Sequence, residues 1–293
     1  GDHGELRLLT TDLLVEGIHF LRDALSPFEL GQKAMAVNLS DIAAMGGWPL
    51  DALVSVAVPA SLPVEELDGL YEGLKAMAAR FEVNLVGGDT TGSPGPWVIN
   101  LAVTGQVEKD RILYRSGARE GDWLFVTGFL GDSRGGLEAL LSGRRSASPE
   151  AAELVRRHHG PLPHLREART LAFSGLAHAM LDLSDGLASD VRRLCDRSSV
   201  GALIEEDRLP LSPELVTYCS AWGRDARAMA LQGGEDYVLL VAADPRLAEH
   251  VADTGMPLHR VGRIVERGRL GLERSDGSVV PLEPVGWDHF RSV

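Results

Sequence analysis

Hydrophobic and polar residues follow two spacings along the first hundred positions of the chain. Short runs rich in branched residues and bounded by Gly or Pro predict strands at residues 6–10, 53–58, 84–86 and 98–107. Apolar residues instead recur at helical spacing over residues 27–45 and 64–81. Strands alternating with helices predict an α/β fold.

The same alternation continues in the second half. The pattern predicts strands at residues 123–127, 202–205 and 237–241, and helices at 149–159 and 163–174. A glycine-rich turn after the first of these strands contains Gly131-Asp132-Ser133, which we interpret as a tight turn rather than a phosphate cradle. The charged, irregular stretch 108–121 suits a crossing between two domains, so we expect domains at 1–112 and 113–293.

Composition narrows the class of protein. The chain has 293 residues, and its 44% hydrophobic content supports a substantial core, while a net charge of -13 argues against a nucleic-acid surface. Cys195 and Cys219 are too few for a disulfide framework or a four-thiolate zinc site. No run approaches the roughly 18 apolar residues of a membrane span, and no signal peptide is visible. We expect a cytoplasmic protein without nucleic-acid or membrane partners.

Five aspartates lie in apolar or glycine-rich segments where a charge is unexpected. They are Asp12, Asp41, Asp89, Asp182 and Asp185. An ionised carboxylate out of water is costly unless it is paired or binds a metal ion. Magnesium is usually held by a few carboxylates together with substrate phosphates. The pattern therefore predicts a divided magnesium site and a phosphoryl-transfer enzyme.

The local setting of these acids leaves structural alternatives open. Thr10-Thr11-Asp12 is placed at the end of the first strand, and Gly87-Gly88-Asp89-Thr90 follows a later one; each alone is typical of a cap or a turn. Asp41 interrupts the apolar stripe of its helix. Ser184 or Asp185 could cap the helix that follows Gly186, but capping does not need the second carboxylate of Asp182, and like charges close together favour a cation.

The chain has no Walker A loop, because no lysine lies in a glycine-rich turn. If the protein handles ATP, its charge must be neutralised mainly by metal ions. Arg115, beside Ser116 and Gly117, is the candidate arginine, and solvation of its side chain is the alternative.

Seven stretches follow one another along the chain in an order that characterises a known family. They are TTDLLVEGIHF (10–20), AVNLSDIAAMG (36–46), VGGDT (86–90), RSGAREGD (115–122), LDLSDG (181–186), GGEDY (233–237) and WDHF (287–290). Together they resemble the thiamine-monophosphate kinase family, within the aminoimidazole ribonucleotide synthetase superfamily. The resemblance runs nearly end to end.

This resemblance implies a two-domain α/β (α+β) fold whose N-terminal domain dimerises through a shared β-barrel, with ATP bound between the domains. It implies ATP as co-substrate, several Mg²⁺ ions, thiamine monophosphate as acceptor and a homodimer. The implied magnesium ligands are Thr10, Thr11, Asp12, Asp41, Asp89, Asp182 and Asp185. The implied ATP contacts are Gly88, Asp89, Arg115 and Ser184. The implied thiamine phosphate contacts are His19, Glu235 and Trp287.

The chemistry of the last three residues is compatible with those roles. Trp287 offers an aromatic face to a thiazolium cation, or it anchors the C-terminus in a core. Glu235 could accept a hydrogen bond from an aminopyrimidine, or it is an exposed loop acid, and a lone His19 is usually structural. The family's upstream Gly-Asp-Asp motif is not equated with Gly1-Asp2-His3, which lies too close to Thr10, so Asp2 receives no role.

The expected reaction is direct in-line transfer of the γ-phosphoryl group to thiamine monophosphate, with no covalent or general-base residue assigned. One alternative is another ATP-using enzyme of the superfamily: a purine-pathway cyclo-ligase, a selenophosphate synthetase or a hydrogenase-maturation protein. The other alternative is a nucleotide- or thiamine phosphate-binding sensor without turnover.

Overall fold

The computed structural model describes residues 4–283. Within them, the chain forms two compact units, one from residues 4–112 with 159–165 and one from 113–158 with 166–283. Asp2 and Trp287 lie outside the described residues.

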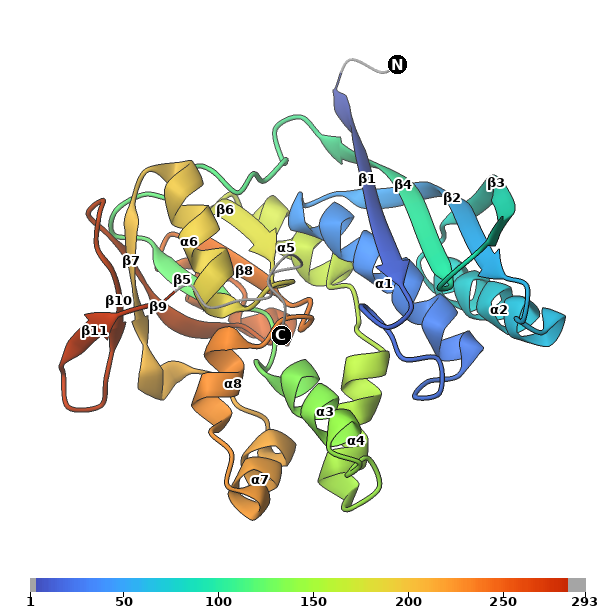
Figure 1. Cartoon of the computed structure of the whole chain (residues 1–293). Coiled ribbons are helices and arrows are strands. Elements are labelled where there is room, and N and C mark those ends of the chain that lie inside the picture. Colours follow the sequence, from blue (N-terminus) through green and yellow to red (C-terminus); the bar gives the residue numbers. More distant parts are fainter. Residues whose placement is uncertain (1–3, 284–293) are drawn as a thin grey trace. The chain divides into compact units, whose positions relative to one another are not determined.

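The first unit is an open sheet with two helices against one face (Figure 1). Its strands are β1 (Glu5–Val15), β2 (Trp48–Pro59), β3 (Asn84–Ser93) and β4 (Val98–Glu108), in the order β1-β4-β2-β3. Only the β2/β3 pair is parallel. The helices are α1 (Pro27–Ala44) and α2 (Val64–Arg80). The four described strands do not close into a barrel, because β1 and β3 remain edges.

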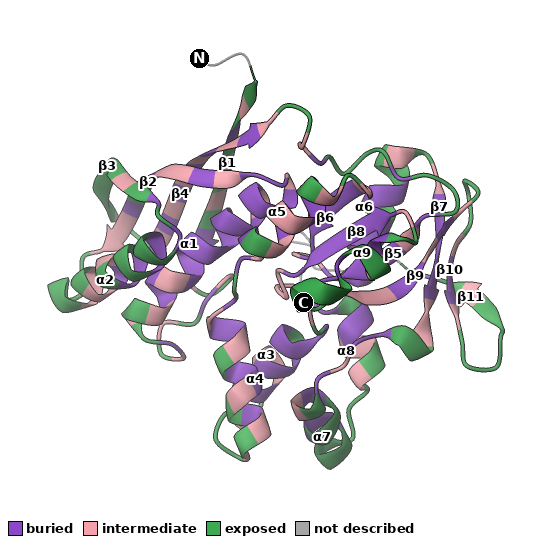
Figure 2. Cartoon of the chain, turned by 180° about the vertical axis from the view of Figure 1, so that it is seen from behind, coloured by how far each residue is buried: buried purple, intermediate pink, exposed green. Residues whose placement is uncertain are grey.

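Local chemistry explains where α1 begins and how it lies. The Ser26 hydroxyl accepts the Glu29 backbone N–H at 3.2 Å, and the Glu29 carboxylate accepts the Ser26 N–H at 2.8 Å, which forms a capping box in front of Pro27. The helix is buried almost throughout (Figure 2), since it packs against both the sheet and α2.

The second unit is a seven-stranded mixed sheet with helices around it, in the order β11-β10-β7-β9-β5-β8-β6. Its strands are β5 (Trp123–Val126), β6 (Ala177–Asp182), β7 (Gly201–Glu205), β8 (Leu239–Ala243), β9 (His259–Val265), β10 (Leu270–Glu273) and β11 (Val279–Pro281). Its helices are α3 (Asp132–Leu141), α4 (Pro149–His159), α5 (Leu165–Ser174), α6 (Leu187–Ser198), α7 (Pro213–Trp222), α8 (Ala226–Gln232) and α9 (Leu247–His250).

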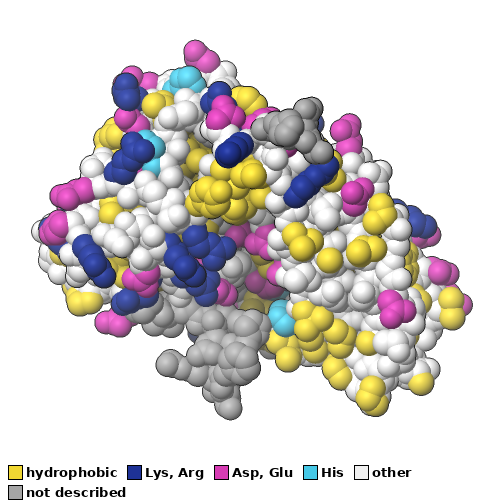
Figure 3. Space-filling view, turned by 90° about the horizontal axis from the view of Figure 1, so that it is seen from above, with side chains coloured by type: hydrophobic (Ala, Val, Ile, Leu, Met, Phe, Trp, Pro, Cys, Tyr) yellow, Lys and Arg dark blue, Asp and Glu magenta, His cyan; other side chains and the backbone are white. Residues whose placement is uncertain are grey.

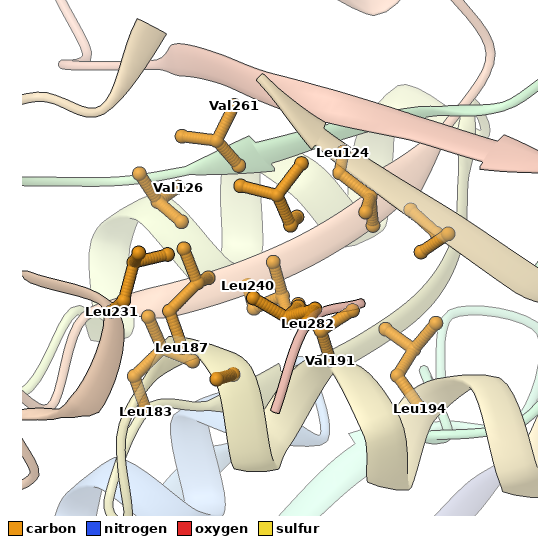
Figure 4. Packing of buried hydrophobic residues seen from close by; sticks show 14 of the residues in the cluster. Leu124, Val126, Leu183, Leu187, Val191, Leu194, Leu231, Leu240, Val261 and Leu282 are labelled. Atoms are coloured by element: carbon orange, nitrogen blue, oxygen red, sulfur yellow. The ribbon is translucent and has the colours of Figure 1, made fainter. Parts of the chain in front are cut away.

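The core of the second unit lies between α6 and the sheet. Leu187, Val191 and Leu194 of α6 point toward Leu124 and Leu240 on the strands (Figure 4). A smaller apolar cluster holds α3, α4 and α7 together. The loop at the start of α6 is thereby fixed to a rigid support.

Most predicted elements are confirmed, among them the helices over 27–45, 64–81 and 149–159 and the strand at 202–205. The strand predicted at 237–241 begins two residues later, because Tyr237 has a positive φ of 51° that a strand does not allow. Within residues 4–283, no helix is long and apolar enough to cross a membrane.

Two predicted strand ends are wrong. Thr10-Thr11-Asp12 lies in the middle of β1, because β1 stays paired with β4 from Glu5 to Val15. Gly87 to Thr90 lies within β3, which follows β2 as far as Ser93. The polar and glycine residues of both segments are therefore presented by strands and not by loops.

Candidate functional site

In the first unit, alternation along β1 separates the candidate ligands. Thr10 and Asp12 lie on the face that packs against α1, and the Thr10 hydroxyl donates a hydrogen bond to the Asp41 carboxylate of that helix. The backbone N–H of Asp12 donates to the buried Asn38 amide oxygen at 3.0 Å. The structure thus brings Thr10 and Asp41 together and holds Asp12 beside the same helix.

Thr11 and Asp89 lie on the opposite face of this sheet. The Thr11 hydroxyl accepts a hydrogen bond from the Asn100 amide at 2.9 Å. Asp89 is paired in register with Ser55, is exposed, and accepts the Thr90 N–H at 2.9 Å. Within the described protomer, these two candidates are therefore separated from Thr10 and Asp41 by the sheet itself.

Gly88 has a packing role that the sequence did not indicate. A Cβ atom at this position would lie 1.7 Å from the backbone oxygen of Val54 on β2. The close approach of β3 to β2 therefore requires glycine here, independently of any nucleotide.

His19 stabilises the turn after β1. Its Nδ1 accepts the backbone N–H of Val15 at 3.1 Å, so the neutral ring carries its proton on Nε2. The residue has a local structural role in addition to the substrate contact that the family resemblance implies.

In the second unit, the Asp182–Gly186 loop joins β6 to α6 without a side-chain cap. The residue before the helix is Gly186, with a φ of 109°, and no side chain caps the first turn. A Cβ there would meet the Gly233 backbone oxygen at 2.9 Å, so the loop lies tightly against the Gly233–Tyr237 segment. The capping alternative for Ser184 and Asp185 is therefore wrong.

The acidic side chains of this loop belong to a larger charged cluster. Asp190, with no exposed surface, accepts the Asp185 backbone N–H at 3.1 Å, and Arg193 pairs with both Asp185 and Asp190. Burial raises the pKa of Asp190 to about 7; Arg193 lowers this pKa, whereas the charges of Asp185 and Asp182 raise it. Asp190 and Arg193 are not among the predicted site residues, although their (i, i+3) spacing on a helix is a recognisable pairing signal.

Glu235 lies in a second group of polar side chains. Its carboxylate is 3.5 Å from the His158 Nδ1, which in turn lies 2.8 Å from the Ser133 hydroxyl. The neighbouring Asp236 accepts the backbone N–H groups of Gly131 and Ser133 at 2.7 and 3.2 Å. These N–H groups are thus already used within the chain, which argues against a phosphate cradle. The predicted tight turn is wrong in part, because Asp132 and Ser133 begin α3 directly after Gly131.

Arg115 lies in the irregular segment after the first unit. It is exposed, and its backbone oxygen accepts the Ser198 hydroxyl at 3.4 Å. No ion pair to its guanidinium occurs among residues 4–283. An exposed arginine of this kind suits an anionic ligand, but the surrounding geometry does not define one.

The donor chemistry fits magnesium, although no complete site is formed. The candidate ligands are hydroxyl and carboxylate oxygens, which a hard cation prefers. In the described part of the chain, no group of three or more His, Cys, Asp or Glu side chains is arranged to hold a metal ion. The donors are divided between the two units: Thr10 and Asp41, which are hydrogen-bonded, belong to the first, and Asp182 and Asp185 belong to the second.

Comparison with known proteins covers both units. Residues 2–107 match the family described as AIR synthase related protein, N-terminal domain, and residues 119–275 match its C-terminal domain. The Aquifex aeolicus thiamine-monophosphate kinase is 38% identical over 97% of this chain and 88% of its own length. The Bacillus subtilis enzyme of that name is 34% identical over 99% of this chain and 90% of its own.

The chain belongs to the thiamine-monophosphate kinase family.

Among solved structures, the family member described as AaThiL complexed with AMPPCP and TMP superposes with a TM-score of 0.89 at 38% identity, covering 98% of this chain and 88% of that one. A hydrogenase maturation protein, HypE, has a TM-score of 0.78 at 19% identity, and that likeness shows the fold alone.

Proposed function

We propose that this member of the thiamine-monophosphate kinase family transfers the γ-phosphoryl group of ATP to thiamine monophosphate, giving thiamine diphosphate and ADP. The observation that carries the proposal is the similarity to thiamine-monophosphate kinases over nearly the whole chain, including a relative whose structure contains AMPPCP and TMP. An oxygen of the acceptor phosphate attacks the γ-phosphorus in line, and the bond from that phosphorus to the ADP oxygen breaks. The acceptor phosphate is already ionised at neutral pH, so no general base is required.

Charge is the main obstacle to this reaction, since both reactants are polyanions. Mg²⁺, when bound, would offset their repulsion and the charge spread over the transferred group. We assign its ligands to the oxygen donors Thr10, Thr11, Asp12, Asp41, Asp89, Asp182 and Asp185. The Thr10–Asp41 hydrogen bond and the rigid α6 support hold some of these donors in place before any ligand arrives.

The remaining assignments concern the residues that orient the two substrates. Gly88, Asp89, Arg115 and Ser184 are proposed to contact ATP, and His19, Glu235 and Trp287 to contact thiamine monophosphate. Two features support this division: the Nε2 proton of His19 can be donated to a phosphate oxygen, and Glu235 is held in an unusual backbone conformation with a φ of 64°. Holding two reactants in line converts a bimolecular step into a nearly unimolecular one.

We also propose a homodimer that forms through the outer face of the first sheet. This face exposes large apolar side chains: Leu9 is 77% exposed, Leu13 51%, Leu53 47% and Val86 59%. They come from β1, β2 and β3, on the side away from α1 and α2. Figure 3 shows that hydrophobic side chains gather in patches on one face of the molecule. Contiguous exposed apolar surface marks an interaction site, and pairing two such sheets is how a shared barrel would form.

A cytoplasmic location completes the proposal and agrees with the two buried thiols, which form no disulfide.

The reaction is tested by incubating the protein with ATP, Mg²⁺ and thiamine monophosphate and measuring thiamine diphosphate by its fluorescence after oxidation to thiochrome. Product that requires both ATP and the metal supports the kinase. ATP binding without product would favour a sibling enzyme or a sensor.

The metal assignment is tested separately with Asp41→Asn. This change keeps the hydrogen bond from Thr10 but removes the charge, so turnover should fall by roughly a hundredfold or more while the thermal melting curve is retained. Activity equal to that of the unchanged protein at saturating Mg²⁺ would remove Asp41 from the ligand set.

A further inference from the structure

The Gly233–Tyr237 segment contains two backbone conformations that ordinary residues avoid. Glu235 has a φ of 64° and Tyr237 a φ of 51°, and neither is glycine. Residues with a side chain rarely adopt this left-handed backbone conformation, and where they do, the surrounding structure must hold them in it. The residue between them is Asp236, so the contacts of Asp236 show what holds the segment.

Three segments meet at Asp236. The N–H of Glu235 donates to the Ser184 backbone oxygen and the N–H of Tyr237 to that of Leu183, each at 2.9 Å. The Asp236 carboxylate reaches the other way and accepts the N–H groups of Gly131 and Ser133 at the start of α3, one on each oxygen. The segment is therefore fixed on one side to the loop before α6 and on the other to the turn before α3.

The same turn also reaches the side chain of Glu235. Ser133, whose N–H is held by Asp236, has its hydroxyl 2.8 Å from the His158 Nδ1, and that nitrogen lies 3.5 Å from the Glu235 carboxylate. Ser133 and His158 are both buried. The contacts form a closed ring through Glu235, Asp236, Ser133 and His158. The position of the Glu235 carboxylate therefore depends on the hydrogen bonds that Asp236 accepts.

We propose that Asp236 is a positioning residue that holds Glu235 in place for thiamine monophosphate. The inference rests on the proposed contact between Glu235 and that substrate. Burial raises the pKa of Asp236 to about 8, while the N–H donors of Gly131 and Ser133 lower it. A carboxyl group offers both oxygens as acceptors to these N–H groups, whereas an amide has one acceptor oxygen and would turn an NH₂ group toward the second donor. Asp236→Asn should therefore release one side of the ring without changing the size of the side chain.

The test compares Michaelis constants for the two substrates in the full chain. Losing one of the two N–H contacts of Asp236 releases Glu235, so Asp236→Asn should raise KM for thiamine monophosphate by about tenfold or more. KM for ATP should stay within about twofold. Glu235→Gln should give a similar selective rise, because it alters the group that Asp236 positions.

Asp225→Asn is the matched control. Asp225 is exposed and accepts the N–H groups of Arg227 and Ala228 at the start of α8, so the control removes the same kind of helix-capping carboxylate away from Glu235. Both Michaelis constants should be unchanged in this variant. Should Asp236→Asn fail to fold, Asp236→Glu keeps the carboxyl group but displaces it by a methylene group and should show the same selective rise in KM.

The outcomes separate the two proposals. A selective rise in KM in both Asp236→Asn and Glu235→Gln supports positioning. Equal losses for both substrates in Asp236→Asn, or values like those of Asp225→Asn, would overturn it. A rise in Asp236→Asn without one in Glu235→Gln would also overturn it, because Asp236 would not act through Glu235. Absence of product from the unchanged protein would instead refute the proposed kinase reaction.

Discussion

Gly88→Ala distinguishes a glycine required by the sheet from one required by ATP. The added Cβ would lie 1.7 Å from the Val54 backbone oxygen and 2.7 Å from the Val54 carbonyl carbon, whereas ordinary contact begins at 3.4 Å. No side-chain rotation relieves this clash, because both partners are backbone or fixed to it. Strand β3 would have to move away from β2 at the centre of their pairing, between Leu53 and Ser55.

The expected magnitude follows from two costs. Overpacking usually costs about 1–3 kcal/mol, and each backbone hydrogen bond lost adds about 1 kcal/mol. We therefore expect Gly88→Ala to lower the free energy of unfolding by about 3 kcal/mol or more, a large part of the 5–15 kcal/mol typical of folded proteins. Urea unfolding measures the change through its midpoint.

Gly92→Ala is the matched control on the same strand. A Cβ at Gly92 meets nothing within 4 Å, so this variant should be unchanged or more stable by up to about 1 kcal/mol through a less flexible unfolded chain. The reasoning is refuted if the two variants unfold within about 1 kcal/mol of each other, which is less than the typical overpacking cost. A stable Gly88→Ala variant that loses only ATP affinity would assign the glycine to the nucleotide instead.

Three further predictions use the charge, thiol and surface data. Arg193 pairs with Asp185 and Asp190 and neutralises their charge, so Arg193→Gln should strengthen Mg²⁺ binding several-fold in a calorimetric titration. The control is Arg192→Gln at the exposed neighbouring position. Equal Mg²⁺ affinities of the two variants would contradict the idea that Arg193 competes with the metal. Burial raises the pKa of Cys195 to about 12 and that of Cys219 to about 11. Because the thiolate is the reactive form, both thiols should resist a disulfide reagent at pH 8 until the chain is denatured. Rapid labelling of the folded protein would count against this prediction. Leu9→Arg places a charge on the proposed dimer face and should shift sedimentation equilibrium toward the monomer, whereas an unchanged mass would remove that face from the interface.

The sequence alone determined the class of fold and the family. Helical spacing located α1 and α2 to within a residue or two, because apolar residues that recur every three to four positions mark a buried helix face regardless of its partners. The aspartates stood out for a similarly local reason: a carboxylate such as Asp41 among apolar residues is costly in any fold unless something binds it.

Tertiary structure decided which face each candidate occupies. Strand β1 continues past Asp12 only because β4 pairs with it, and that pairing sends Thr10 toward α1 and Thr11 to the opposite face. Neighbours in sequence became separated by a sheet, which composition and spacing cannot show.

Long-range contacts also determined the supporting residues. Asp236 is an ordinary acid in the sequence, and its importance comes from the N–H groups of Gly131 and Ser133, which the folded chain places beside it. Hydrogen bonds between segments a hundred residues apart depend on how the elements pack, and a single sequence holds no local signal for them. The sequence therefore predicted which groups carry the chemistry, and the packing of sheet and helices decided which of them meet.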